Sequence, residues 1–459
     1  MSEEVVKETE TEASNETSNT IVAPAYMLSL SVENFRCFKQ KQILDLSRGD
    51  EEPAQWTLIL GENGVGKTTL LQLLALMQPI ETGLYDMLKS YIPRLLRVDY
   101  DRNLFRTGNT TSDGNQTLRA DVVKISCSVS SGQSFNSVSK KNVISYEAEI
   151  YRSGGSGASV YCEEPALIFY GYGASRRMGT TSLSDSLNSD TSASLFSDTV
   201  ELLNAEEWLL QADYARTRSK AAERHRAEAR YERVKTMLIE LLPDVENLRI
   251  PESSSPSLAA HVQAKTPYGW VPIQSLSLGY RTLLTWMVDL AARLFERYPD
   301  SKNPLAEPAV VLVDEIDLHL HPRWQRTLIQ FLSDTFPNTQ FIATAHSPLV
   351  VQAAVDANIV LLRREGDHVV IENDVEAIKG WRIDQVLTSD LFGLQSARPP
   401  QMDAALKERT RILAKSRLTK ADKERLVQLE KSIGDLPTGE TPSDMEAMDI
   451  IRRAAQLLK

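Results

Sequence analysis

The sequence predicts an α/β fold with a mainly parallel sheet. Two short and continuously apolar runs, Trp56–Leu60 and Ala309–Val313, have the composition of strands buried on both faces. From Thr68 onward, leucines cover nearly the whole circumference of a predicted helix, which is typical of a buried helix. Strand and helix patterns alternate up to about Leu394, so we expect helices to cover a layered sheet.

Composition excludes several classes of protein. Of the 459 residues, 42% are hydrophobic and 25% are charged, as in ordinary globular proteins. The net charge of -11 argues against a surface covered in positive charge, although it allows a local basic groove. Cys37, Cys127 and Cys162 form no CxxC pair, so neither a zinc site nor a disulfide framework is predicted. Because Met1–Thr20 lacks the features of a signal peptide and no apolar run reaches about 18 residues, we expect a cytoplasmic protein without a membrane partner.

Five segments follow from shifts in composition. Residues 1–25 are acidic and polar and are predicted to be a disordered tail. Residues 26–198 and 251–395 are predicted as the N-terminal and C-terminal lobes of one α/β domain. A helical insertion at 199–250 separates the lobes, and a polar helical region is expected at 396–459.

The strongest motif is the phosphate-loop pattern G-x-x-x-x-G-K-[ST], which lies between the first apolar strand and the buried helix. Its glycines let backbone N–H groups face phosphates, and the helix N-terminus adds partial positive charge. We expect Lys67 to reach the β- and γ-phosphates of ATP and Thr68 to ligate Mg²⁺. The nucleotide-binding residues predicted here are Gly61, Glu62, Asn63, Gly64, Val65, Gly66, Lys67, Thr68 and Thr69.

Two carboxylates follow the second apolar strand. Asp314 and Glu315 would lie at its C-terminal end, where open α/β sheets bind ligands. We expect Asp314 to share the Mg²⁺ with Thr68, and Glu315 to polarise the attacking water. A solvated turn is the alternative, and the phosphate loop elsewhere in the chain makes it the weaker one.

A third motif lies between the other two. The segment Leu276–Tyr280, L-S-L-G-Y, resembles the signature L-S-G-G-Q of ABC ATPases, with departures at Leu278 and Tyr280. The resemblance implies that Ser277 and Gly279 contact the γ-phosphate bound by a second subunit. The alternative is an ordinary helix start capped by Ser277.

Further residues extend the resemblance to the RecF, Rad50 and OLD-like branch of ABC ATPases. The opening S-V-E-N-F-R-C-F, which starts at Ser31, resembles the start of that branch, and Ile316–Pro322 resembles its D-loop. His346, after a predicted strand at Gln340–Ala343, resembles the switch histidine that senses the γ-phosphate. The resemblance implies a head-to-tail dimer in which Lys67, Glu315 and His346 act in catalysis. No residue is assigned to the Q-loop glutamine.

Features outside the motifs indicate which members of this branch the chain resembles. The insertion is too short for a long coiled coil, and no TOPRIM nuclease motifs follow His346. The tail Asp384–Leu394 resembles standalone ATPases encoded beside HNH nucleases in anti-phage defence systems. That resemblance implies a regulatory scaffold that assembles into a ring-like oligomer such as a hexamer and carries a separate HNH nuclease. The alternatives are a RecF-like DNA-repair ATPase and a PARIS-like scaffold that sequesters a TOPRIM effector.

One segment and two pairs of residues allow more than one interpretation. The segment Ala215–Lys235 is rich in arginine and lysine, and it fits contact with DNA, contact with protein, or a solvated helix. Arg176 and Arg177 fit either a phosphate contact or a solvated turn. A metal pair formed by His319 and His321 is disfavoured because no further ligands are nearby in the sequence.

Overall fold

The computed structural model describes residues 25–49, 52–82, 90–93, 122–131, 143–151, 156–159, 167–179, 190–251, 261–373, 375, 380–394, 396–415 and 417–433. The chain divides into two compact units, residues 1–381 and 382–459, which are described separately below. Apart from Ala25, the predicted acidic tail lies outside the described residues.

The central sheet of the first unit has six strands in the order β16-β15-β3-β14-β13-β9. Neighbouring strands are parallel except β15 and β16, which form an antiparallel pair. Every residue of β13 and β14 is buried, which explains the continuously apolar sequence of β13. The strands are β3 (Trp56–Gly61), β9 (Phe169–Tyr172), β13 (Ala309–Val313), β14 (Thr339–Thr344), β15 (Asn358–Glu365) and β16 (His368–Glu372).

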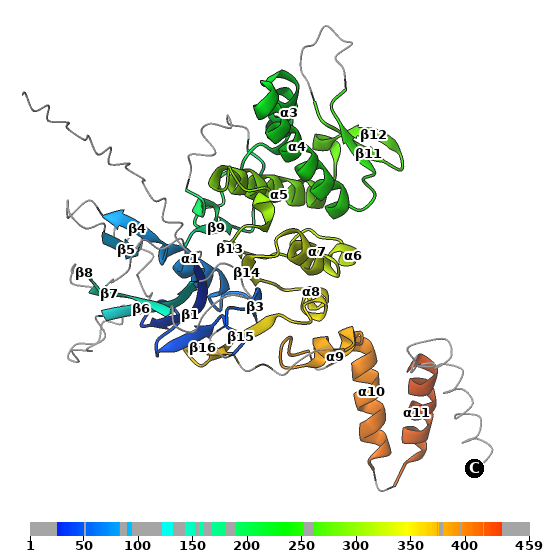
Figure 1. Ribbon diagram of the computed structural model, residues 1–459. Helices are drawn as coiled ribbons and strands as arrows, with labels where there is room; N and C mark the ends of the chain where they lie inside the picture. Colours follow the sequence, from blue (N-terminus) through cyan, green and yellow to red (C-terminus); the bar gives the residue numbers. More distant parts are fainter. Residues whose placement is uncertain are drawn as a thin grey trace, which may run out of the picture. The chain divides into compact units, whose positions relative to one another are not determined.

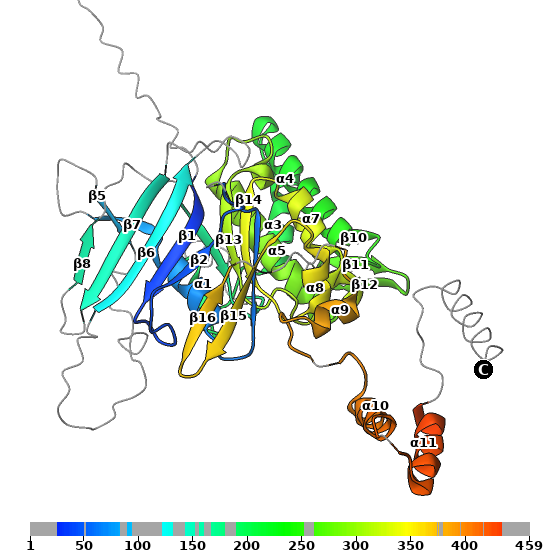
Figure 2. The same cartoon turned by 90° about the horizontal axis from the view of Figure 1, so that it is seen from below.

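A second, antiparallel sheet lies beside the first, in the order β2-β1-β6-β7-β8. Helix α1 (Lys67–Leu76) lies between the two sheets, as Figures 1 and 2 show. The strands are β1 (Ala25–Glu33), β2 (Gln42–Asp45), β6 (Val122–Ser131), β7 (Val143–Tyr151) and β8 (Ser156–Ser159); a separate hairpin is formed by β4 (Pro79–Thr82) and β5 (Ser90–Pro93).

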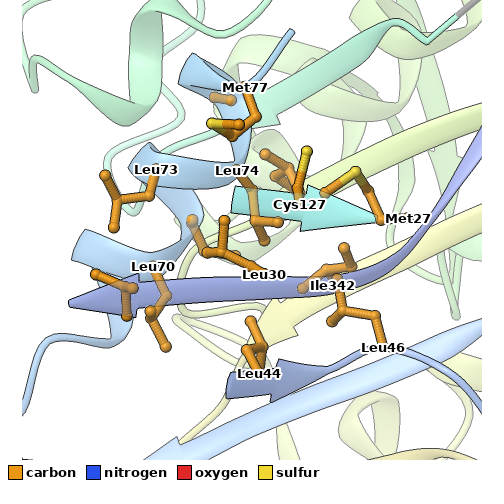
Figure 3. Packing of buried hydrophobic residues seen from close by; sticks show 14 of the residues in the cluster. Met27, Leu30, Leu44, Leu46, Leu70, Leu73, Leu74, Met77, Cys127 and Ile342 are labelled. Carbon is orange, nitrogen blue, oxygen red and sulfur yellow. The ribbon is translucent and has the colours of Figure 1, made fainter. Parts of the chain in front are cut away.

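The main hydrophobic core fills the space around α1. Leucines on several sides of the helix contact residues of both sheets, such as Leu30 on β1 and Ile342 on β14 (Figure 3). Burial of leucines all around α1 confirms the prediction of a buried helix. The first residues of this helix are therefore held firmly at the C-terminal end of β3.

The other face of the central sheet is covered by helices of the C-terminal lobe (Figures 1 and 2). They are α5 (Leu278–Arg297), α6 (Pro322–Gln325), α7 (Leu328–Thr335) and α8 (Pro348–Ala353). Helix α5 begins immediately after Ser277. Two residues separate the end of α6 from the start of α7.

The helical insertion forms two antiparallel helices, α3 (Ala205–Arg218) and α4 (Ala221–Leu241).

A buried carboxylate connects α5 to strand β9, because Asp289 on α5 accepts hydrogen bonds from Tyr172 on β9 (2.9 Å) and from Arg293 (2.8 Å). A small sheet follows in the chain, formed by β10 (Asn247–Arg249), β11 (Gln263–Thr266) and β12 (Gly269–Pro272).

The second unit is helical over its described residues. It contains α9 (Ile383–Thr388), α10 (Pro400–Leu413) and α11 (Lys420–Ile433), with Ile412, Leu426 and Leu429 buried between α10 and α11. Thr419 and Asp422 form a capping box, each accepting a hydrogen bond from the other's backbone N–H. Among all described residues, no helix is long and apolar enough to cross a membrane.

Candidate functional site

An open cavity of about 330 Å³ lies where the phosphate loop and the ends of the central strands meet. It brings together residues that are far apart in the sequence but follow β3, β13 and β14 in the same sheet. The lining residues are Arg36, Cys37, Asn63, Gly64, Gly66, Lys67, Thr68, Thr69, Asp314, Glu315 and His346. The position agrees with the rule that parallel sheets bind ligands at the carboxyl ends of their strands.

The phosphate loop has the backbone conformation that its glycines permit. Gly64 and Gly66 have φ angles of 80° and 95°, a region that residues with a side chain rarely adopt. A Cβ on Gly66 would also lie 2.7 Å from the Cys37 sulfur. Substitution at Gly66 would therefore distort the loop for two independent reasons.

Lys67 lies at the first position of α1 and folds back over the loop. Its ammonium donates to the carbonyls of Gly61 (2.8 Å) and Glu62 (2.9 Å). Burial lowers the pKa of Lys67, and the nearby carboxylates of Asp314 and Glu315 oppose that shift. The side chain is thus positioned at the loop where a phosphate group would lie.

Asp314, which directly follows β13, forms hydrogen bonds to helix α1 and to strand β14. Its Oδ2 accepts from the Thr68 hydroxyl at 2.7 Å, and its Oδ1 accepts from the Thr344 hydroxyl at 2.6 Å. The paired hydroxyl and carboxylate fit a Mg²⁺ ion, which prefers oxygen ligands and takes its remaining ligands from phosphate and water. The described residues contain no cluster of three or more metal-binding His, Cys, Asp or Glu side chains. We therefore expect the ion to bind together with the phosphates, which supply some of its ligands.

Glu315 adjoins Asp314 and is half-buried at the edge of the cavity. Its backbone is in the left-handed region, with a φ of 50°. The Thr344 hydroxyl accepts from the Glu315 N–H at 2.7 Å, and Arg176 donates to the Glu315 carbonyl at 2.7 Å. Such a carboxylate beside a phosphate site has the position required of a general base.

His346 follows β14 and also lines the cavity. Its backbone N–H donates to Asp317 at 3.0 Å, which connects it to the loop that follows Glu315. The predicted phosphate-loop residues Gly61, Glu62 and Val65 lie in the same loop without lining the cavity. The structure therefore brings the loop, both acids and the histidine to one place.

Ser277 and Gly279 lie outside this cavity. Neither lines this cavity among the described residues, and Ser277 is exposed at the start of α5. Gly279 is buried against the next loop, because a Cβ there would lie 2.4 Å from the His319 carbonyl oxygen. Contact of these two residues with a nucleotide remains a prediction that concerns a second copy of the chain.

Several residues at the site were not assigned from the sequence. Arg36 and Cys37 line the cavity, and Arg36 donates to the Thr69 hydroxyl at 2.9 Å. A basic residue between the first strand and the phosphate loop was visible in the sequence, but nothing there indicated its contact. Arg176 is 2% exposed and does not line the cavity, so it fits neither of the two interpretations offered above.

Part of the basic segment on α3 and α4 is occupied by contacts within the chain. Arg216 pairs with Asp213 at 2.7 Å and stacks over Tyr231, and Arg233 donates to the Lys302 carbonyl. The segment is divided between two separate helices, because α3 ends at Arg218 and α4 begins at Ala221. Contact with DNA remains a prediction.

Two family models match the chain. The model described as "AAA domain, putative AbiEii toxin, Type IV TA system" matches residues 164–352, and one described as "AAA domain" matches residues 29–158. Together with the phosphate loop, the acidic strand end and the signature-like segment, these matches define an ATPase domain of the ABC type.

The chain is similar to the Septu protein PtuA of Bacillus mycoides (strain KBAB4), with 24% identity over 380 residues. The match covers 82% of this chain and 46% of that protein, so the chain spans about half the length of this relative. The Retron Vc95 probable ATPase of Vibrio cholerae serotype O1 biovar El Tor is 47% identical over 92 residues, which cover 20% of this chain and 18% of that one. A solved SMC head bound to the C-winged helix domain of ScpA is similar over 76% of this chain and 97% of that chain, with a TM-score of 0.44 and 16% identity.

We expect Lys67→Ala to weaken binding of a Mg²⁺-nucleoside triphosphate about 10- to 100-fold, because charge-assisted hydrogen bonds to the phosphates are lost. Fluorescence anisotropy of a labelled ATP analogue measures the dissociation constant. Lys265→Ala is the matched control, since Lys265 is an exposed lysine on β11 that pairs with Glu246. Equal affinity of the Lys67→Ala protein and the parent would contradict the assignment.

Proposed function

We propose that this chain binds and hydrolyses ATP with Mg²⁺ at a site shared by two copies of itself. One observation carries the proposal: the cavity joins the phosphate loop to Asp314, Glu315 and His346, while Ser277 stays exposed outside it. A P-loop site with a base and a magnesium pair has the parts needed for hydrolysis. An exposed signature segment at the start of a helix is suited to complete the site of a neighbour.

Hydrolysis follows from the positions of these side chains. Backbone N–H groups of the loop and the start of α1 bind the β- and γ-phosphates, and Lys67 leaves its two carbonyl partners to neutralise their charge. Thr68 and Asp314 would hold the Mg²⁺, which neutralises charge that develops on the phosphates. Glu315 then accepts a proton from the attacking water, and His346 contacts the γ-phosphate from the end of β14.

Glu315→Gln tests the role of the base. The amide cannot accept the proton, so we expect kcat to fall at least about 100-fold while the affinity for ATP changes little. Phosphate release in single-turnover experiments measures the rate, and size-exclusion chromatography with ATP should show a trapped dimer. Hydrolysis at the parental rate would show that another group is the base.

A second copy is required because Ser277 and Gly279 do not reach the cavity of their own chain. The start of the 20-residue helix α5 carries partial positive charge, and Ser277 and Leu278 are exposed there. A head-to-tail dimer would place this end over the γ-phosphate of the partner. The interface would then contain two equivalent sites related by a two-fold axis.

Mixing two inactive variants tests the shared site. In a mixed dimer of Lys67→Ala and Ser277→Arg chains, one site carries both defects and the other carries none. Because about half of the dimers are mixed and one of their two sites is intact, an equimolar mixture should regain about a quarter of the parental ATPase activity. No recovery after exchange of subunits, with mixed dimers verified by two affinity tags, would refute the shared site.

We further propose that the ATPase regulates an anti-phage defence complex. Similarity to a Septu protein and to a retron ATPase supports this role, as does the tail Asp384–Leu394, which forms α9 and the turn after it. The chain would form a larger oligomer such as a hexamer and carry a separate HNH nuclease that cuts DNA. A RecF-like repair ATPase and a TOPRIM-sequestering scaffold are the competing assignments.

Co-expression with the neighbouring gene tests this role. We expect an HNH protein to co-purify with this chain, and ATP to change the rate at which the complex cuts plasmid DNA. The Lys67→Ala complex is the control and should show the same cleavage with and without ATP. Recombination genes or a TOPRIM effector in the neighbouring position, with no HNH protein bound, would favour one of the competing assignments.

A further inference from the structure

Arg176 is a charged side chain inside the protein. It is 2% exposed, and its Nε and Nη1 have no hydrogen-bond partner among the described residues. Burial lowers the pKa of Arg176 to about 10, while the carboxylates of Asp314, Asp317 and Glu315 act in the opposite direction. Burying a charged arginine with unpaired donors costs free energy of folding. Such a residue in a folded protein therefore needs an explanation.

Among the described residues, the Arg176 side chain donates one hydrogen bond, to the backbone of the proposed base. Strand β9 runs beside β13, and Tyr172 extends the pairing by accepting from the Asp314 N–H at 2.8 Å. The chain then turns at Gly173, where a Cβ would lie 2.0 Å from the Ser194 carbonyl oxygen. This fixed turn returns Arg176 to the end of β13, and its Nη2 donates to the Glu315 carbonyl at 2.7 Å.

Glu315 is therefore held through both of its backbone groups. On one side the Thr344 hydroxyl accepts from its N–H, and on the other its carbonyl accepts from Arg176 and from the Leu318 N–H at 3.0 Å. The residue has a left-handed φ of 50°, which is unfavourable for a side chain with a Cβ and persists only where neighbouring groups enforce it. The fixed backbone determines where the Glu315 side chain begins at the edge of the cavity.

We propose that Arg176 is a positioning residue for ATP hydrolysis: it holds Glu315 in its left-handed conformation and so directs the carboxylate at the attacking water. The inference rests on the proposed function, since it needs Glu315 as the base. The positive charge of Arg176 also offsets the negative charges of Asp314 and Asp317. Arg176 does not line the cavity, so its effect passes through Glu315 and not through the nucleotide.

Arg176→Met removes the donor and keeps an unbranched buried side chain. We expect kcat to fall about 10- to 100-fold, as for a small misplacement of a catalytic group. The KM for ATP should change less than about threefold, because the phosphate loop is untouched. Arg176→Lys keeps the charge and one donor and should retain an intermediate rate. Arg177→Met, at the exposed neighbouring arginine, is the matched control and should hydrolyse ATP at the parental rate.

A double-mutant cycle separates positioning from general destabilisation. With Glu315→Gln already present, Arg176→Met should lower the remaining single-turnover rate by less than about twofold, because the group that it positions is gone. An undiminished loss in that background, or an Arg176→Met enzyme with parental kcat, would overturn the proposal. If Arg176→Met does not fold, as judged by its Tm, Arg176→Lys gives the same comparison with the same two overturning outcomes.

The cycle also distinguishes failure of this inference from failure of the proposed function. If the parental chain hydrolyses no more ATP than Lys67→Ala, or if Glu315→Gln keeps the parental rate, the proposed function is wrong and Arg176 has no base to position. If both behave as expected and only the cycle fails, ATP hydrolysis stands and Arg176 acts in some way that does not involve Glu315.

Discussion

The site depends on the carboxylate of Asp314 and the two hydroxyls that bind it. Thr68 is the second residue of α1, and Thr344 comes from the end of β14, the strand that separates β3 from β13. The Thr344 hydroxyl also accepts from the Glu315 N–H, so one side chain orients both acids. Burial in a place with little water strengthens such bonds and makes the loss of any partner costly.

Contiguous motifs made part of this site predictable. The phosphate loop, Asp314 and Glu315 each adjoin a strand whose apolar run is visible in the sequence, and parallel strands bring their carboxyl ends to one edge. Fold class and the order of the main strands and helices follow from the same local patterns.

The remaining contacts could not be found in this way. Arg36 meets Thr69 across 33 residues, and Arg176 meets Glu315 across 139, so both depend on how separate strands pair. A buried arginine in a glycine-rich turn has the same sequence pattern as an exposed one. Only the neighbouring strand determines which of Arg176 and Arg177 points inward.

The close approach of Gly279 to the His319 carbonyl has a consequence for timing between subunits. The signature end of α5 rests on the loop that continues directly from Glu315 in the same chain, with no room for a methyl group between them. A rearrangement of that loop would press on the end of α5. In the proposed head-to-tail dimer, this contact would connect hydrolysis at one site with the residues that complete the other site.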